Sequence, residues 1–440
     1  MYVTDIHLEN LKSFKELKFD LKRPDGTFAG WTVFLGGNSS GKSTLLKGIA
    51  LALLGPESGK QLLGQTAGWI HKSEKKAFTA ATLTCDPAHD TFKKGGKLTK
   101  EFAAGVRWFS EKEDEIPQFR AVDLRNANGT KIQTSERGPW NPNSSGWFSA
   151  GYGPMRRLTG SSSESMRYAV SKEIESRFVT LFREDAALSE SEEWLKKMHS
   201  RVLESQDSDQ AQFLEGVKSL LGDGLLPHGM TISRITVDHV FVNNHQGLEL
   251  PMRDISDGCR SIYATILDLI HGMYEVYGVE NLFAEDAEGK PYVTRPGVVI
   301  IDEIEAHLHP AWQKEIPYWL KSHFPAIQFL VSSHSPLIAQ AADPNGLFIL
   351  PLQDEVSRKP RAVTSEEFLK IRFGRAEKTL LGVAFGLRTT RSKWANQQIE
   401  VWKKLDAKKR AGVPLKKDEA ANYKALKKQL EFELEPLPTL

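Results

Sequence analysis

A glycine- and serine-rich stretch near the N-terminus has the residue types and spacing of a phosphate-binding loop. Residues 36–43 fit the pattern G-x-x-x-x-G-K-[ST], with an apolar, strand-like run before them and a helical pattern after them. In such a loop backbone N–H groups surround phosphates, the lysine reaches the β- and γ-phosphates, and a hydroxyl binds Mg²⁺. This context favours a nucleoside triphosphate site over a chance glycine-rich turn. The predicted phosphate contacts are Gly36, Asn38, Ser39, Gly41, Lys42, Ser43 and Thr44, with Lys42 also catalytic and Ser43 also a Mg²⁺ ligand.

A pair of carboxylates provides the second candidate group. Residues 297–301 form a continuous aliphatic run, which is typical of a central parallel strand, and Asp302 and Glu303 follow it directly. Because side chains alternate along a strand, the two carboxylates should point in different directions. We expect Asp302 to hold Mg²⁺ and Glu303 to act as the general base that polarises the attacking water.

Two further segments are weak signals alone but become informative in a chain that also has the phosphate-binding loop and the carboxylate pair. Ser256 and Gly258 open a predicted helix; alone they indicate only a capped helix, but a helix N-terminus also favours a bound anion. His334 follows the strand-like residues 328–333, where it could contact a γ-phosphate. His307 and His309 could form an H-x-H metal site, although we favour polar contacts in an interface loop.

These side chains need strands and helices to position them. Residues 2–35, 77–85, 102–109 and 231–250 have strand patterns, whereas residues 163–226 have helical periodicity without long heptads. Residues 147–158 read as a strand that ends in a Gly-Tyr-Gly-Pro turn. The three polar side chains of that turn could face a nucleotide or nucleic acid, or could be structural; they are Tyr152, Arg156 and Arg157.

Composition sets wide bounds. The chain has 440 residues, 40% hydrophobic and 26% charged, with a formal net charge of +2, so any basic surface must be local. Its two cysteines have no metal-binding spacing, which suits a reducing compartment. No apolar run approaches the length of a membrane span. These features predict a soluble, cytoplasmic protein with no membrane partner.

The order of the four segments resembles the head of an ABC-type ATPase of the RecF/SMC/OLD-like superclass, over roughly residues 1–350. The resemblance implies ATP and Mg²⁺ as cofactors, and a homodimer in which two heads enclose two ATP molecules. It also implies that Ser256 and Gly258, within the signature segment (residues 253–261), contact the γ-phosphate held by the loop of the other subunit, residues 36–44. Residues 12–14 match a nucleotide-proximal strand of that superclass. The pattern departs from the superclass in two ways: no glutamine occupies the strand end before residues 151–154, and Cys259 stands where an aromatic residue or glutamine is usual.

The resemblance is strongest to compact AAA-family ATPases of bacterial antiphage systems of the Septu, PARIS and retron-associated type. The segments that carry it are GYGPMRR, DEIEAHLHP and FGLRTTRS. We therefore expect an α/β fold, an ABC-ATPase head with a β-rich N-terminal lobe, a P-loop parallel sheet flanked by helices, a short helical insertion and a C-terminal helical hairpin. The expected divisions are 1–160 (N-terminal lobe), 161–228 (insertion), 229–352 (C-terminal lobe) and 353–440 (basic helical region).

Three functions agree with these patterns. The first is an ATP-hydrolysing switch whose nucleotide-driven dimerisation controls a separate effector, a nuclease, in antiphage defence. The second is a RecF-like DNA-binding ATPase in DNA repair, and the third is a nucleotide-sensing scaffold with little turnover. The 106 residues after His334 (440 − 334) contain no histidine, which excludes an HNH centre from that stretch. The basic helices predicted there are either a solvated face or a surface that docks a partner or nucleic acid.

Overall fold

The computed structural model describes residues 1–63, 68–92, 101–109, 118–121, 133–141, 144–158, 160, 162, 165, 174–205, 208–226, 229–243, 246–350, 359–382 and 384–431. Its contacts divide the chain into two units, Met1–Thr379 and Leu380–Leu440. The four-part division expected from the sequence remains a prediction.

The first unit contains a core sheet with the strand order β17-β16-β3-β15-β14-β8. All neighbours are parallel except β17, which is antiparallel to β16. The aliphatic residues of β14 are fully buried, as the sequence predicts for a central strand. Because the parallel strands end at one edge, the residues that follow β3, β14 and β15 lie close together there. The strands are β3 (Gly30–Leu35), β8 (Ser149–Tyr152), β14 (Gly297–Ile301), β15 (Ile327–Ser333), β16 (Leu347–Ile349) and β17 (Arg361–Ala362).

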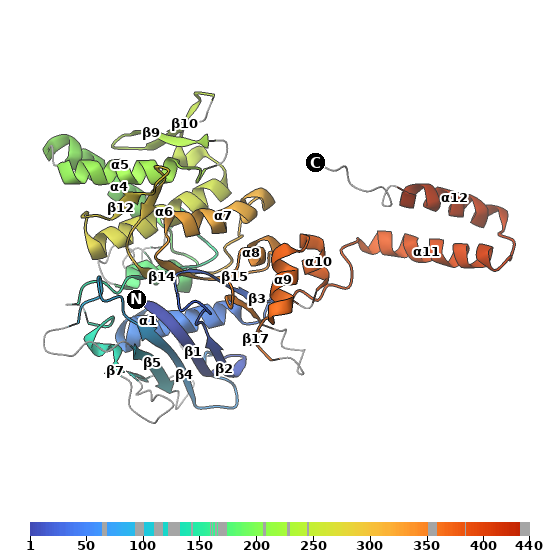
Figure 1. Ribbon diagram of the computed structural model, residues 1–440, viewed down its shortest axis with the longest axis horizontal. Helices are drawn as coiled ribbons and strands as arrows, with labels where there is room; N and C mark the ends of the chain where they lie inside the picture. Colours follow the sequence, from blue (N-terminus) through green and yellow to red (C-terminus); the bar gives the residue numbers. More distant parts are fainter. Residues whose placement is uncertain are drawn as a thin grey trace. The chain divides into compact units, whose positions relative to one another are not determined.

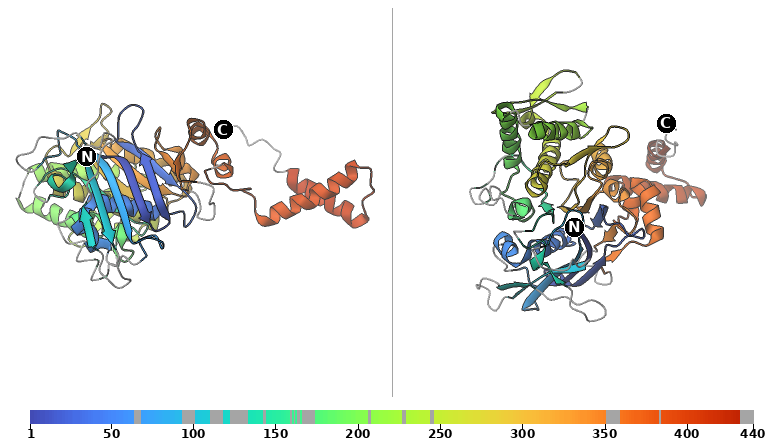
Figure 2. Two further views of the ribbon diagram at one scale, coloured as in Figure 1. Left: turned by 90° about the horizontal axis from the view of Figure 1, so that it is seen from below. Right: turned by 60° about the vertical axis from the view of Figure 1, so that its left-hand side comes forward.

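A second sheet packs on the opposite side of helix α1 (Lys42–Leu63) (Figures 1 and 2). Its strand order is β2-β1-β4-β5-β6, with β7 paired to β5. Helix α1 contacts β4 and β5 on one side and β14 and β15 on the other, and it kinks at Gly55, where φ is 81° and Pro56 follows. Its strands are β1 (Tyr2–Leu11), β2 (Phe14–Asp20), β4 (Lys76–Thr84), β5 (Glu101–Phe109), β6 (Gln118–Ala121) and β7 (Gln133–Thr134).

One buried side chain joins the two sheets directly. The Gln328 amide on β15 donates to the Val3 carbonyl at 2.8 Å, and its oxygen accepts from the Val3 N–H at 2.7 Å. Both bonds are buried and join residues 325 positions apart in the sequence. Strand β1 is therefore fixed to the strand that leads to His334.

Helices gather around α6 in the remainder of the first unit (Figure 1). The stretch predicted to be helical contains η2 (Ile174–Phe178), α3 (Val179–Phe182), α4 (Ser189–Ser205) and α5 (Ser208–Gly222), and α4 and α5 both pack against α6. Strands predicted for residues 231–250 form a small sheet, β11-β10-β9. The other elements are η1 (Ser135–Arg137), β9 (Thr231–Ile235), β10 (Val240–Asn243), β11 (Glu249–Pro251), η4 (Met252–Asp254), α6 (Asp257–Tyr277), β12 (Phe283–Glu285), β13 (Pro291–Val293), α7 (Pro310–His323), α8 (Pro336–Gln340), α9 (Ser365–Phe373) and α10 (Ala376–Leu381).

The second unit contains the predicted helical hairpin, α11 (Lys393–Arg410) and α12 (Lys417–Glu431). The helices pair through the buried side chains of Leu405 and Leu426. The Tyr423 hydroxyl also donates to Asp406 at 2.9 Å. Across the part of the chain that the structure describes, no helix is long and apolar enough to cross a membrane.

Candidate nucleotide-binding site

The phosphate loop (residues 36–44) connects β3 to α1 at the edge where the parallel strands end. Ser39 and Gly41 have positive φ angles of 64° and 94°, a type of backbone conformation found in anion-binding loops. A side chain at Gly41 would collide with the Phe14 ring. The loop borders a cavity of about 590 Å³, lined by Lys12, Ser13, Asn38, Ser39, Gly41, Lys42, Ser43, Thr44, Glu303 and His334.

Gly36 has a different role from the other predicted phosphate contacts. It is not among the residues that line the cavity. A side chain at this position would collide with the Ser40 side chain and the Leu350 carbonyl. Gly36 therefore allows the loop to close against β16, while the residues after it face the cavity.

The Lys42 ammonium lies inside the loop. Its Nζ donates to the carbonyl oxygens of Gly36 and Gly37, both at 3.0 Å, and the residue is 5% exposed. Burial lowers the pKa of Lys42, and the nearby carboxylates oppose that shift. The loop carbonyls thus hold the ammonium at the cavity, where a phosphate could replace them as the acceptor.

The two carboxylates after β14 separate as the strand alternation predicts. Asp302 is 1% exposed and accepts a hydrogen bond from the Ser332 hydroxyl. The Glu303 N–H donates to the same hydroxyl at 2.8 Å. The Glu303 side chain is 41% exposed and lines the cavity. Ser332, which sequence reasoning did not single out, therefore orients both residues from the end of β15.

A buried arginine holds the carboxylate turn (residues 302–305). The Arg156 guanidinium is 2% exposed and donates to the carbonyl oxygens of Asp302, Glu303 and Ile304 at 2.8, 3.1 and 3.4 Å. It also donates to the Gly153 carbonyl at 2.7 Å. Burial lowers its pKa to about 10, which still leaves it charged at neutral pH. These bonds fix the turn at Glu303, whose φ of 47° is unusual for a non-glycine residue.

Replacing this arginine should destabilise the protein. We expect Arg156→Met to lower the free energy of unfolding by about 2–4 kcal/mol, because it leaves buried carbonyls without a donor. Urea denaturation measures this change. Arg157→Ala is the matched control, since Arg157 is exposed and donates only to the Glu184 carbonyl among the bonds described. Equal losses in the two variants would contradict the role of Arg156 in the turn.

His334 faces the carboxylate turn from the end of β15. Its Nε2 lies 3.8 Å from a Glu303 carboxylate oxygen, and its backbone N–H donates to the Glu305 carboxylate. Burial first, and the positive charge of Lys42 second, lower the pKa of His334. The imidazole is therefore mostly neutral at pH 7, so it can both donate and accept hydrogen bonds beside Glu303.

The signature segment lies at a second cavity. Ser256 and Gly258 line a space of about 700 Å³ together with Cys259 and His307, and neither lines the cavity of the phosphate loop. Ser256 occupies the predicted N-cap position of α6, but its hydroxyl donates to the Cys259 sulfur at 3.0 Å instead of capping the helix. A side chain at Gly258 would collide with the His307 carbonyl, so this glycine permits close packing within the chain.

The H-x-H alternative is not supported by the geometry. His309 is the N-cap of α7, where its Nδ1 accepts from the Ala311 N–H at 3.3 Å. Within the described ranges, no cluster of three or more histidine, cysteine or acidic side chains could hold a metal ion. His307 and His309 instead border the cavity that Ser256 and Gly258 share.

The Gly-Tyr-Gly-Pro turn is structural at two of its three polar positions. Tyr152 is 1% exposed, and its hydroxyl donates to Asp268 at 2.9 Å. Arg156 holds the carboxylate turn, as described above. Arg157 is exposed and donates to the Glu184 carbonyl at 2.8 Å. None of the three lines the cavity of the phosphate loop.

The donor set suits a magnesium ion. Ser43 offers a hydroxyl oxygen at the cavity, and Asp302 offers a carboxylate whose position is fixed by Ser332. Hydroxyl and carboxylate oxygens are ligands that Mg²⁺ accepts alongside phosphate oxygens and water. These two residues would hold Mg²⁺, and the ion would supply positive charge against the phosphates.

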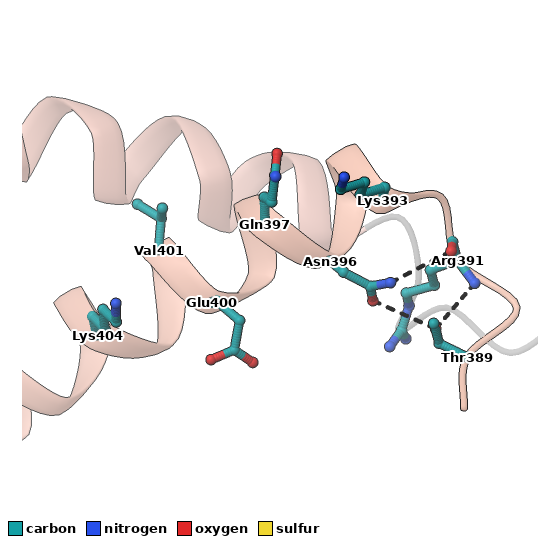
Figure 3. A pocket seen from close by; sticks show the side chains of 8 residues that line it. All are labelled: Thr389, Arg391, Lys393, Asn396, Gln397, Glu400, Val401 and Lys404. Carbon is teal, nitrogen blue, oxygen red and sulfur yellow. Dashed lines mark hydrogen bonds between the residues drawn. The ribbon is translucent and has the colours of Figure 1, made fainter.

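A shallow cavity on α11 differs in its lining residues from the cavity of the phosphate loop (Figure 3). It measures about 670 Å³, and its lining mixes cations with Glu400, amides and Val401. Asn396 closes one end, accepting from the Thr389 hydroxyl and donating to the Arg391 carbonyl, both at 3.4 Å. It has no glycine loop or paired carboxylates, so it offers none of the chemistry gathered at the phosphate loop.

Comparison with known proteins identifies the family to which this sequence belongs. The family model "AAA domain, putative AbiEii toxin, Type IV TA system" matches residues 32–339. The chain is 28% identical over 336 residues to Septu protein PtuA of Bacillus mycoides (strain KBAB4), covering 76% of this chain and 38% of that protein. It is 23% identical over 390 residues to "Retron Vc95 probable ATPase" of Vibrio cholerae serotype O1 biovar El Tor, covering 76% of this chain and 70% of that protein.

A solved Smc head domain from Pyrococcus furiosus, with an extended coiled coil and bound to the C-terminal domain of ScpA, is 16% identical with a TM-score of 0.46. That match covers 84% of this chain and 98% of the Smc chain. The family model spans well over half of the 440 residues and includes the phosphate loop, the signature segment, the carboxylate turn and His334. The chain therefore belongs to this AAA-domain family and is similar to Septu protein PtuA and to a retron probable ATPase.

Proposed function

We propose that the protein is an ATP-hydrolysing switch that works as a homodimer. One observation carries this proposal: Lys42, Glu303 and His334 share one cavity, whereas Ser256 and Gly258 line another. Each chain thus presents two half-sites, the phosphate loop and the signature segment, and neither is a complete nucleotide site. Two copies arranged head to head could complete two sites by pairing the phosphate loop of each with the signature segment of the other.

Within each site, the residues have distinct roles. The loop N–H groups and Lys42 bind the β- and γ-phosphates. Glu303 accepts the proton of the attacking water, and Arg156 and Ser332 hold its backbone in place. His334, mostly neutral and 3.8 Å from Glu303, can donate to the γ-phosphate or orient the same water. Ser43 and Asp302 are the proposed Mg²⁺ ligands.

Mixed subunits test the shared site. Lys42→Ala and Ser256→Arg should each be inactive alone, because each removes one half of both sites in a homodimer. Mixing them in equal amounts should restore about a quarter of the wild-type ATPase rate, since half of the dimers are mixed and each has one intact site. Steady-state ATP hydrolysis measures the recovery. Complete inactivity of the mixture, with both variants folded and able to exchange subunits, would exclude the composite site.

Control of a separate effector in antiphage defence is the wider proposal. It is supported by the similarity to a Septu protein and a retron ATPase. In this role the ATP-bound dimer would present or withhold a surface for an effector, proposed to be a nuclease. A pull-down from the native host, compared between the ATP-bound and nucleotide-free protein, would identify that partner. An effector that binds equally in both states would argue against nucleotide control.

The charge of the C-terminal hairpin favours a second candidate, a RecF-like ATPase that binds DNA. Residues 393–431 contain eleven lysines and arginines against five acidic residues, a net charge of +6, whereas the whole chain has +2. Some of these cations are already paired, as Lys408 is with Glu419 at 2.7 Å. Binding of duplex DNA by the isolated protein that requires ATP and weakens steeply with salt would favour this candidate.

A further inference from the structure

A chain of hydrogen bonds connects the carboxylate turn to α6. It begins on the backbone, where the Asp302 N–H donates to the Tyr152 carbonyl at 2.8 Å. Strands β8 and β14 are parallel neighbours with Ile301 beside Tyr152, so the end of β8 follows any displacement of the residues after β14. Tyr152 is thus fixed to a residue of the nucleotide site without lining the cavity itself.

The Tyr152 side chain continues the connection into α6. Its hydroxyl donates to one oxygen of the Asp268 carboxylate at 2.9 Å, and the Ser191 hydroxyl of α4 donates to the other at 2.6 Å. Burial and the nearby Asp268 raise the pKa of Tyr152, so the phenol stays protonated and acts as the donor. A hydrogen bond from a hydroxyl to a carboxylate is stronger than one between two neutral groups.

Helix α6 can carry a displacement from Asp268 to the signature segment. Ser256 lies twelve residues before Asp268, about 18 Å along the helix at 1.5 Å per residue. The intervening turns carry the buried side chains of Ile262 and Ile266, which anchor this part of the helix in the core. At the other end of α6 the Tyr277 hydroxyl donates to the Pro296 carbonyl at 2.8 Å, just before β14 begins.

We infer that the Tyr152 hydroxyl, acting through the Asp268 carboxylate, is a positioning group that couples the carboxylate turn to the signature segment. This inference rests on the proposed function and adds to it the connection within each subunit. ATP held by the phosphate loop would fix the carboxylate turn, the turn would fix Tyr152, and Tyr152 would fix the angle at which α6 presents Ser256 and Gly258. Without this bond, each half-site still forms but the two are no longer coordinated.

The experiment compares three variants that each remove one buried hydroxyl. Tyr152→Phe removes the proposed connection and keeps the ring in the core. Ser191→Ala removes the other donor to Asp268 but leaves Tyr152 in place. Tyr263→Phe is the control variant on α6. The buried hydroxyl of Tyr263 has no hydrogen-bond partner among the described residues, so its removal breaks no bond. ATP affinity, kcat, ATP-dependent self-association and thermal stability are measured for each.

Tyr152→Phe should lower kcat and the association constant of the ATP-bound dimer about tenfold, while the Kd for ATP stays within about twofold. Ser191→Ala should lose similar thermal stability yet keep kcat and self-association within about twofold of wild type. Tyr263→Phe should match wild type in all four measurements. Equal effects of Tyr152→Phe and Ser191→Ala on kcat would overturn the inference, since loss of any donor to Asp268 would then suffice. A wild-type protein that neither hydrolyses ATP nor associates would instead overturn the proposed function.

Discussion

Lys42→Ala should weaken ATP binding by at least about a hundredfold, because it removes a charged donor that lies inside the phosphate loop. The Lys42 ammonium donates to the Gly36 and Gly37 carbonyls, which hold it inside the loop where a phosphate would lie. The Kd of a fluorescent ATP analogue measures the loss.

Lys60→Ala is the matched control for this variant. Lys60 is exposed in the last turn of the same helix α1, so its removal should leave ATP affinity unchanged. Circular dichroism of both variants checks that the fold is retained. Wild-type affinity in a folded Lys42→Ala protein would rule out the phosphate-loop assignment.

Glu303→Gln should lower the ATPase rate by about a hundredfold or more while ATP binding persists. Glutamine keeps the shape of the side chain and cannot accept the proton of the attacking water. The backbone bonds from Ser332 and Arg156 do not depend on the carboxylate, so the turn should remain intact. The ATP-bound dimer should therefore live longer than that of the wild type. Single-turnover hydrolysis and sedimentation in ATP measure these two effects.

Glu315→Gln gives the same change of charge at an exposed position on α7 and should behave as wild type. The comparison also separates a switch from a scaffold. If Glu303→Gln matched wild type in both turnover and dimer lifetime, hydrolysis would not drive the cycle. The protein would then be better described as a nucleotide-sensing scaffold.

The gathering of the proposed catalytic residues was predictable because parallel strands end at a common edge. Lys42, Glu303 and His334 each follow an apolar, strand-like run, and the structure brings all three to one cavity. The helical hairpin near the C-terminus was predictable for a similar reason, since its apolar spacing and the break at residues 411–414 are local features. Local patterns specify local structure well.

The supports of the site were harder to predict because they pair with the backbone. Arg156 donates to backbone carbonyl oxygens. Every residue has such a carbonyl, so the sequence does not indicate which residues Arg156 contacts. Similarly, Gln328 bonds the main chain of Val3, and Ser332 reaches both the Asp302 carboxylate and the Glu303 N–H. The polar residues that interrupt an otherwise apolar strand β15 were the available signal. A buried polar side chain needs a partner, but its sequence neighbours do not identify that partner.

The position of β3 in the core sheet has a consequence for how the protein folds. This strand leads into the phosphate loop, yet its two neighbours are β15 and β16, which are synthesised near the end of the first unit. An emerging chain thus carries the complete phosphate loop long before β3 has a partner on either side. Contacts of such large sequence separation form slowly. The nucleotide site should therefore be among the last parts to assemble, and we expect chains that lack β15 and β16 to bind nucleotide poorly.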